Sequence, residues 1–125
     1  MIHNYDFESF LSTDIGSNAV HLHEVVQKYK NSVFVDLGVR QGISSIILSE
    51  NSKENNNEIY GVDIIFNFLD EHVYHSPVAK KNIGDNPNYH KLLGDSCTIG
   101  KHWDSNKKVD ILFVDTFHIK DFTLV

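Results

Sequence analysis

One stretch of sequence decides the fold: Val33-Phe-Val-Asp-Leu-Gly-Val-Arg-Gln-Gly-Ile-Ser-Ser45. Its first part is β-branched and nearly all apolar, which predicts a strand over Ser32–Leu37 that is buried on both faces. The glycine-bounded segment Gly38–Gly42 predicts a turn, and Ile43–Ser49 predicts a helix that opens at Gly42. A strand, a glycine turn and a helix in this order are typical of one unit of a parallel sheet.

Working outward from this unit, three more apolar segments predict strands. They lie at 58–65, 89–93 and 109–115, with helical or polar segments between them. Ahead of the first strand, Leu22, Val25, Val26 and Tyr29 share one face of a predicted amphipathic helix. The alternation predicts a single α/β domain over residues 1–125. Its core would be a Rossmann-like, doubly wound, mainly parallel sheet of about four strands flanked by helices.

Length and composition exclude several classes of protein. The chain has 125 residues, of which 41% are hydrophobic and 22% charged, so it is expected to fold as one domain. A net charge of −6 disfavours a nucleic-acid backbone or an anionic membrane surface as partner. No apolar run approaches the ~20 residues of a membrane span, and the N-terminus lacks the features of a secretory signal. With a single cysteine, Cys97, these features predict a cytoplasmic protein.

Polar residues lie at or just after the carboxyl end of every predicted strand, at the edge where such sheets bind ligands. They are Asp36 with Gly38, Asp63, Asp95 with Ser96, and Asp115 with His118. The Gly38–Gly42 spacing is Gly-x-x-x-Gly, which differs from the dinucleotide fingerprint and from a phosphate-binding loop. These glycines alone could mark a simple tight turn. However, Asp63 follows Gly42 by 21 residues, where an acid is placed to accept hydrogen bonds from ribose hydroxyls. A nucleoside-containing ligand is therefore favoured.

The stretch Val33–Ser45 resembles the first motif of the class I S-adenosylmethionine-dependent methyltransferases. The branch most like it includes the cephalosporin-hydroxylase-like and macrocin-type O-methyltransferases, and the matching residues are Asp36, Gly38, Gly42 and Ser44. Later segments resemble the second, third and fourth motifs of that family: Tyr60–Ile64, Gly94–Ser96 and Val109–His118. The resemblance covers roughly residues 13–122.

The resemblance implies a cofactor, S-adenosylmethionine, and a role for each motif. Asp36 and the Gly38–Gly42 turn, with Ser44, would lie near the methionine part of the cofactor. Asp63 would bind the ribose, and Asp95, with Ser96 nearby, would accept from the adenine amino group. The reaction would be methyl transfer to an oxygen of a small molecule or sugar.

The fourth motif implies the catalytic residues. Asp115 would bind a divalent metal such as Mg²⁺ or contact the substrate, and His118 would act as the general base. Two simpler interpretations stay open. Asp115 could merely cap a following helix, and His118, one of eight histidines, could have no catalytic role.

Other reactive side chains carry weaker signals. The pairs His21 with His23 and His72 with His75 have metal-like spacing, but without a third ligand they are expected to be exposed histidines. Cys97 could be a nucleophile, although a small buried residue is the more ordinary role.

The resemblance also implies about three further strands after the fourth, whereas this sequence stops at Val125. A C-terminally truncated domain is therefore expected, with an open sheet edge that a homo-oligomer would cover. Two other functions stay open. One is a nucleoside-cofactor-binding module, or remnant, that is catalytically incomplete. The other is an NAD-binding Rossmann-like domain, against which the glycine spacing speaks.

Overall fold

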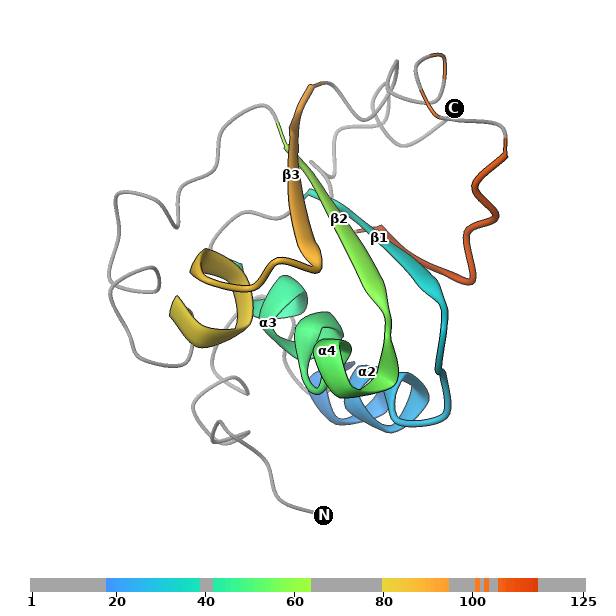
Figure 1. Cartoon of the computed structure of the whole chain (residues 1–125), viewed down its shortest axis with the longest axis vertical. Helices are drawn as coiled ribbons and strands as arrows, with labels where there is room; N and C mark the ends of the chain where they lie inside the picture. Colours follow the sequence, from blue (N-terminus) through green and yellow to red (C-terminus); the bar gives the residue numbers. More distant parts are fainter. Residues whose placement is uncertain are drawn as a thin grey trace.

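The computed structural model describes residues 18–38, 42–63, 80–94, 101, 103 and 106–114. Within them the elements follow one another as α2 (Asn18–Val26), β1 (Val33–Leu37), α3 (Ile43–Ser49), α4 (Ser52–Asn55), β2 (Glu58–Asp63), η2 (Lys80–Gly84), β3 (Tyr89–Leu93) and β4 (Ile111–Val114). The strands form one sheet in the order β3-β2-β1-β4, and every pair is parallel (Figure 1). The α/β fold with a four-stranded parallel sheet and flanking helices, as expected from the sequence, is thereby confirmed.

Strand β1 lies inside the sheet, between β2 and β4. Its three middle residues, Phe34, Val35 and Asp36, are buried, as expected for a strand covered on both faces. The predicted start of the fourth strand was slightly too early, because β4 begins at Ile111. The last two residues of the predicted second strand, 64 and 65, lie outside the described residues.

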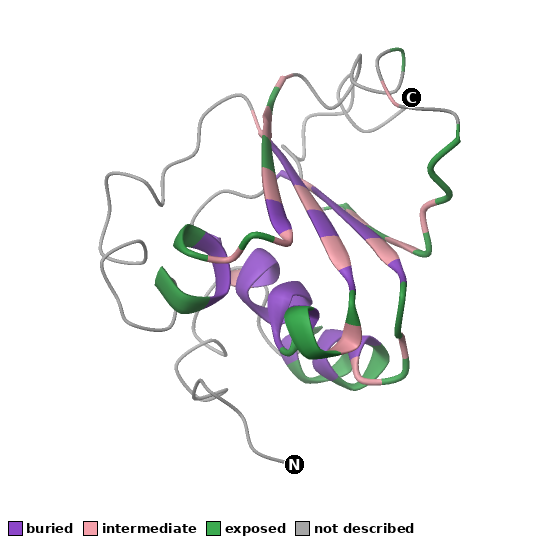
Figure 2. Cartoon of the chain, in the orientation of Figure 1, coloured by how far each residue is buried: buried purple, intermediate pink, exposed green. Residues whose placement is uncertain are grey.

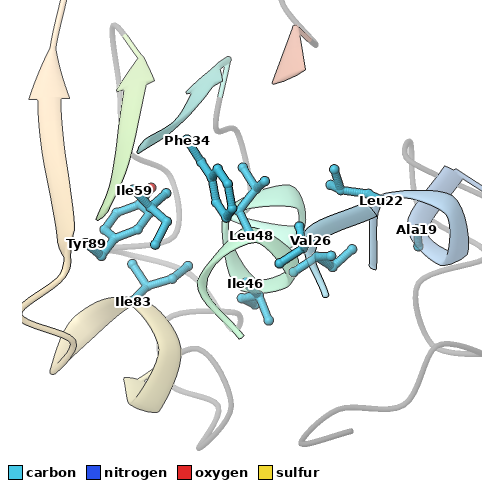
Figure 3. Close-up of a cluster of buried hydrophobic side chains, with 10 residues drawn as sticks. Ala19, Leu22, Val26, Phe34, Ile46, Leu48, Ile59, Ile83 and Tyr89 are labelled. Atoms are coloured by element: carbon cyan, nitrogen blue, oxygen red, sulfur yellow. The ribbon is translucent and has the colours of Figure 1, made fainter. Parts of the chain in front are cut away.

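The core lies between the sheet and the helices, on one face of the sheet. Alternate strand residues, among them Phe34, Ile59 and Tyr89, pack there against side chains of α2, α3 and η2 (Figure 3). Each fully buried aliphatic or aromatic side chain contributes about 1.5–3 kcal/mol relative to an exposed one. Helix α3 is buried along nearly its whole length (Figure 2), so its position relative to β1 is set by packing.

Helix α2 is rotated relative to its predicted apolar face. Its buried residues are Ala19, Leu22, His23 and Val26, whereas Val25 is 39% exposed. His23 replaces Val25 in the interface because its Nδ1 lies 2.7 Å from Oε2 of Glu50, a carboxylate that is itself buried. The expectation of an exposed histidine was therefore wrong for His23, although it holds for His21.

The face of β4 that is turned away from the core carries apolar side chains that the described residues leave uncovered. Leu112 and Val114 are 55% and 57% exposed. Among the described strands, β4 pairs with β1 alone. Covering of this edge by a homo-oligomer stays a prediction. Within the same residues, no helix has the length and apolar character that a membrane crossing requires.

The asparagine-rich segment 51–58 is more ordered than the polar loop that the sequence predicts. It contains the short helix α4, flanked by Asn51 and Asn56 with φ of 56° and 55°. Asn57 is fully buried; its Oδ1 accepts from the Ser32 backbone at 3.0 Å and its Nδ2 donates to the Tyr29 carbonyl at 3.2 Å. This side chain therefore connects the start of β1 to the start of β2, at the edge of the sheet opposite the carboxyl ends of the strands.

Replacing Asn57 with alanine is expected to lower the free energy of unfolding by about 2 kcal/mol, because a buried backbone N–H of Ser32 loses its acceptor. Urea unfolding of the purified chain measures this change. Asn55→Ala, in the neighbouring helix, is the matched control and is expected to stay within about 0.5 kcal/mol of the unchanged chain. Equal losses in the two variants would contradict the structural role of Asn57.

Candidate active site

Asp36 ends the buried part of β1, and α3 holds its side chain. Oδ2 of Asp36 accepts hydrogen bonds from the hydroxyls of Ser44 at 2.7 Å and Ser45 at 2.6 Å. Both serines lie in the first turn of α3, and Asp36 is 0% exposed. These charge-assisted bonds fasten the start of the helix to the end of the strand. Asp36 therefore contacts α3 through the two serines, on either side of the segment that joins β1 to α3.

The turn between β1 and α3 has a glycine at each end. Gly38 has φ of 86° and Gly42 has φ of 91°, in the region where a residue with a Cβ is disfavoured. Residues 39–41 lie outside the described residues. The glycines thus meet a real conformational demand, and they leave both ends of the turn without side chains that would obstruct a ligand.

Three strand ends meet beside this turn. The Gly38 backbone N–H donates to the Val62 carbonyl at 2.8 Å, which places the turn directly beside Asp63. The Gly94 N–H donates to the Asp63 carbonyl at 2.9 Å, which brings the end of β3 to the same place. Asp63 is half-buried, so its carboxylate is near the surface of this edge. The structure therefore brings together Gly38, Asp63 and the segment that leads into Asp95.

Two residues of this region were not singled out from the sequence as site residues. Ser45 bonds Asp36, and its Oγ lies 2.7 Å from the hydroxyl of Tyr89 on β3. Burial, and then the charge of Asp36, raise the pKa of the Tyr89 phenol, and Asp63 adds to the effect. The sequence contained no signal for this contact, since Tyr89 is separated from Ser45 by 44 positions and reads as an ordinary core aromatic.

The raised pKa of Tyr89 predicts weaker folding at alkaline pH. Above pH of about 10 an unfolded chain releases the phenol proton while the folded chain keeps it, so stability falls as pH rises, by up to about 1.4 kcal/mol per pH unit. The Tyr89→Phe variant lacks this proton and is expected to lose less stability over the same range. Urea unfolding between about pH 8 and about pH 11 compares the two slopes, and equal slopes would contradict the assignment.

The remaining predicted site residues lie outside the described residues. These are Asp95, Ser96, Asp115 and His118, together with Cys97, His72 and His75. In the part of the chain that the structure describes, no group of three His, Cys, Asp or Glu side chains is arranged to hold a metal ion. A metal at Asp115 therefore stays a prediction.

Comparisons with known proteins point to one family. A family model described as "Methyltransferase domain" matches residues 35–124, which is more than half of the chain. No curated protein matches the sequence. One similar solved structure is a protein assigned as a protein-L-isoaspartate O-methyltransferase, beta-aspartate methyltransferase, from Plasmodium falciparum, in complex with S-adenosyl-L-homocysteine. It is 15% identical with a TM-score of 0.49, and the match covers 66% of this chain but only 38% of that chain.

Proposed function

The chain belongs to the methyltransferase-domain family, and from this premise we propose that it binds S-adenosylmethionine at the carboxyl edge of its sheet. We further propose that it transfers the methyl group to an oxygen of a small molecule or sugar. The observation that carries the proposal is the meeting of Gly38, Asp63 and Gly94 through two backbone hydrogen bonds. A nucleoside ligand needs such an acid beside a turn whose two ends carry no side chains.

The residues present fit this cofactor. Gly38 and Gly42, with positive φ, leave room for close approach at both ends of the turn. The Asp63 carboxylate supplies acceptors for ribose hydroxyls, and the end of β3 leads into Asp95 and Ser96 for the adenine. Asp36 and Ser44 hold the turn that would face the methionine part. When bound, S-adenosylmethionine supplies an electrophilic methyl group on its sulfonium sulfur.

The catalytic part of the proposal rests on the sequence motif that ends β4. His118 removes the proton of the acceptor hydroxyl, and Asp115 holds a divalent metal such as Mg²⁺ or contacts the acceptor. The narrower likeness to the cephalosporin-hydroxylase-like and macrocin-type branch supports oxygen as the methyl acceptor. A catalytically incomplete module that only binds the cofactor is the alternative, and it would bind S-adenosylhomocysteine without methylating any hydroxylated acceptor.

Calorimetric titration of the purified chain with S-adenosylhomocysteine and, separately, with NAD tests the proposed cofactor. Micromolar binding of S-adenosylhomocysteine with no heat from NAD is the expected result, because the glycine spacing is not that of a dinucleotide site. Far-ultraviolet circular dichroism of the same sample shows whether the chain is folded. A folded chain that binds neither ligand, or only NAD, would overturn the proposal.

A further inference from the structure

A buried line of hydroxyls connects β3 to the end of β1. The Tyr89 hydroxyl lies 2.7 Å from Oγ of Ser45, and Ser45 donates to Asp36 at 2.6 Å. Ser44 donates to the same carboxylate oxygen at 2.7 Å. The four side chains are at most 7% exposed, so water has little access with which to replace these bonds. A polar chain buried in this way has its geometry fixed by its members.

The direction of the hydrogen bonds follows from the chemistry of the groups. An ionised carboxylate only accepts, so the single hydroxyl proton of Ser45 is used on Asp36. The oxygen of Ser45 then accepts, and Tyr89 is the donor at the start of the chain. A tyrosine phenol carries its proton at neutral pH, so Tyr89 can act as this donor. Tyr89 therefore orients Ser45 toward Asp36.

The sheet leaves space for this contact. Tyr89 pairs with Ile59 on β2, and its ring packs in the core cluster with Ile59 and Ile83 (Figure 3). Two residues farther along β2 is Gly61, which pairs with Asp36 and lies on the same face as Ile59. Because glycine has no side chain, nothing from β2 stands at this position between the β1 carboxylate and the side chains of β3.

We propose that Tyr89 is a positioning residue for the cofactor, acting through Ser45 and Asp36 on the turn that receives it. Asp36 lies two residues before Gly38, and Ser44 lies two residues after Gly42. The buried chain therefore fixes both ends of the turn. The inference rests on the proposed function, since the turn matters for binding only where the cofactor binds there.

Tyr89→Phe is the direct test, because it removes the hydroxyl and keeps the ring in the core. Titration with S-adenosylhomocysteine is expected to show an affinity about fivefold lower than that of the unchanged chain, as for one lost hydrogen bond. Tyr29→Phe is the matched control. Tyr29 is a half-buried tyrosine that packs against the same core cluster and belongs to none of the motifs, so removal of its hydroxyl is expected to leave the affinity unchanged.

A double-mutant cycle with Ser45→Ala tests whether the hydroxyls act as one unit. If Tyr89 acts through Ser45, the double variant binds S-adenosylhomocysteine no more weakly than Ser45→Ala alone. Independent, multiplying losses in the two variants would overturn the inference. The cycle also distinguishes this role from an effect on core packing. A loss of affinity caused by altered packing around Tyr89 would persist when Ser45 is already alanine.

Amide hydrogen exchange of the ligand-free protein gives a readout that does not depend on binding. Tyr89→Phe is expected to speed exchange of the peptide that covers residues 42–49 by about tenfold and to leave α2 unchanged. A uniform increase over α2, β1 and α3 would indicate a loss of core stability alone and would overturn the positioning role. If the unchanged chain binds no S-adenosylhomocysteine, the proposed function fails, and this exchange pattern still decides whether Tyr89 holds the turn.

Discussion

Replacing Asp63 with alanine is expected to weaken S-adenosylhomocysteine binding by about 30- to 100-fold, with little change in the free energy of unfolding. Hydrogen bonds to a charged group are worth about 1.5–3 kcal/mol, and every 1.4 kcal/mol is about tenfold in affinity. Asp63 ends β2 and is half-buried, so the carboxylate is not needed to fill the core. Paired calorimetric and urea titrations measure the two quantities.

Two controls make this result specific. Glu54→Ala removes an equal charge from the exposed surface of α4, before β2 begins, and is expected to leave the affinity unchanged. A cofactor analogue without the ribose 2′-hydroxyl is expected to bind the unchanged chain more weakly, yet to lose little further affinity in Asp63→Ala. If the variant discriminated as strongly against the analogue as the unchanged chain does, Asp63 would not be the ribose ligand.

The sequence predicted the part of the fold that depends on local patterns. A buried strand, a glycine-bounded turn and a helix followed from Val33–Ser45 alone, because each has its own local requirement. The turn requires a backbone conformation that favours glycine, as the positive φ of Gly38 and Gly42 shows. The same patterns set the strand order only indirectly, through the rules for parallel crossovers.

Contacts between distant segments could not be predicted in this way. An aspartate at a strand end looks the same in sequence whether it faces a ligand or a helix, and Asp36 is directed to the serines of α3. His23 was expected on the surface because an isolated histidine is usually exposed, but the carboxylate that accompanies it in the interior, that of Glu50, lies 27 residues away. Asn57 likewise belongs to a run that reads as a loop.

These contacts show how the site is supported. The side chains beneath the ligand edge are polar and buried, whereas the surrounding core is aliphatic and aromatic. Buried polar groups are costly unless every member is bonded, so such a group holds one geometry. A cofactor that binds to a turn gains affinity when the turn is already held in its binding shape.

Replacing Asp36 with alanine is expected to lower the free energy of unfolding by about 3–5 kcal/mol, because it removes two charge-assisted hydrogen bonds and leaves two buried serine hydroxyls without their acceptor. That is a large part of the about 5–15 kcal/mol that stabilises an ordinary domain. Urea unfolding measures the loss. Asp110→Ala is the matched control, since its carboxylate accepts one hydrogen bond from the Val33 backbone at an exposed position.

Asp36→Asn separates support of the turn from direct contact with the ligand. The amide keeps the volume and one acceptor for the serines, so this variant is expected to fold, with a smaller stability loss than alanine. If Asp36 acts on the turn through the serines, its affinity for S-adenosylhomocysteine falls by about tenfold, which is less than for Asp63→Ala. An affinity loss larger than that of Asp63→Ala, with stability unchanged, would mean that Asp36 binds the cofactor itself. The full burial of Asp36 and its hydrogen bonds with Ser44 and Ser45 favour the first outcome.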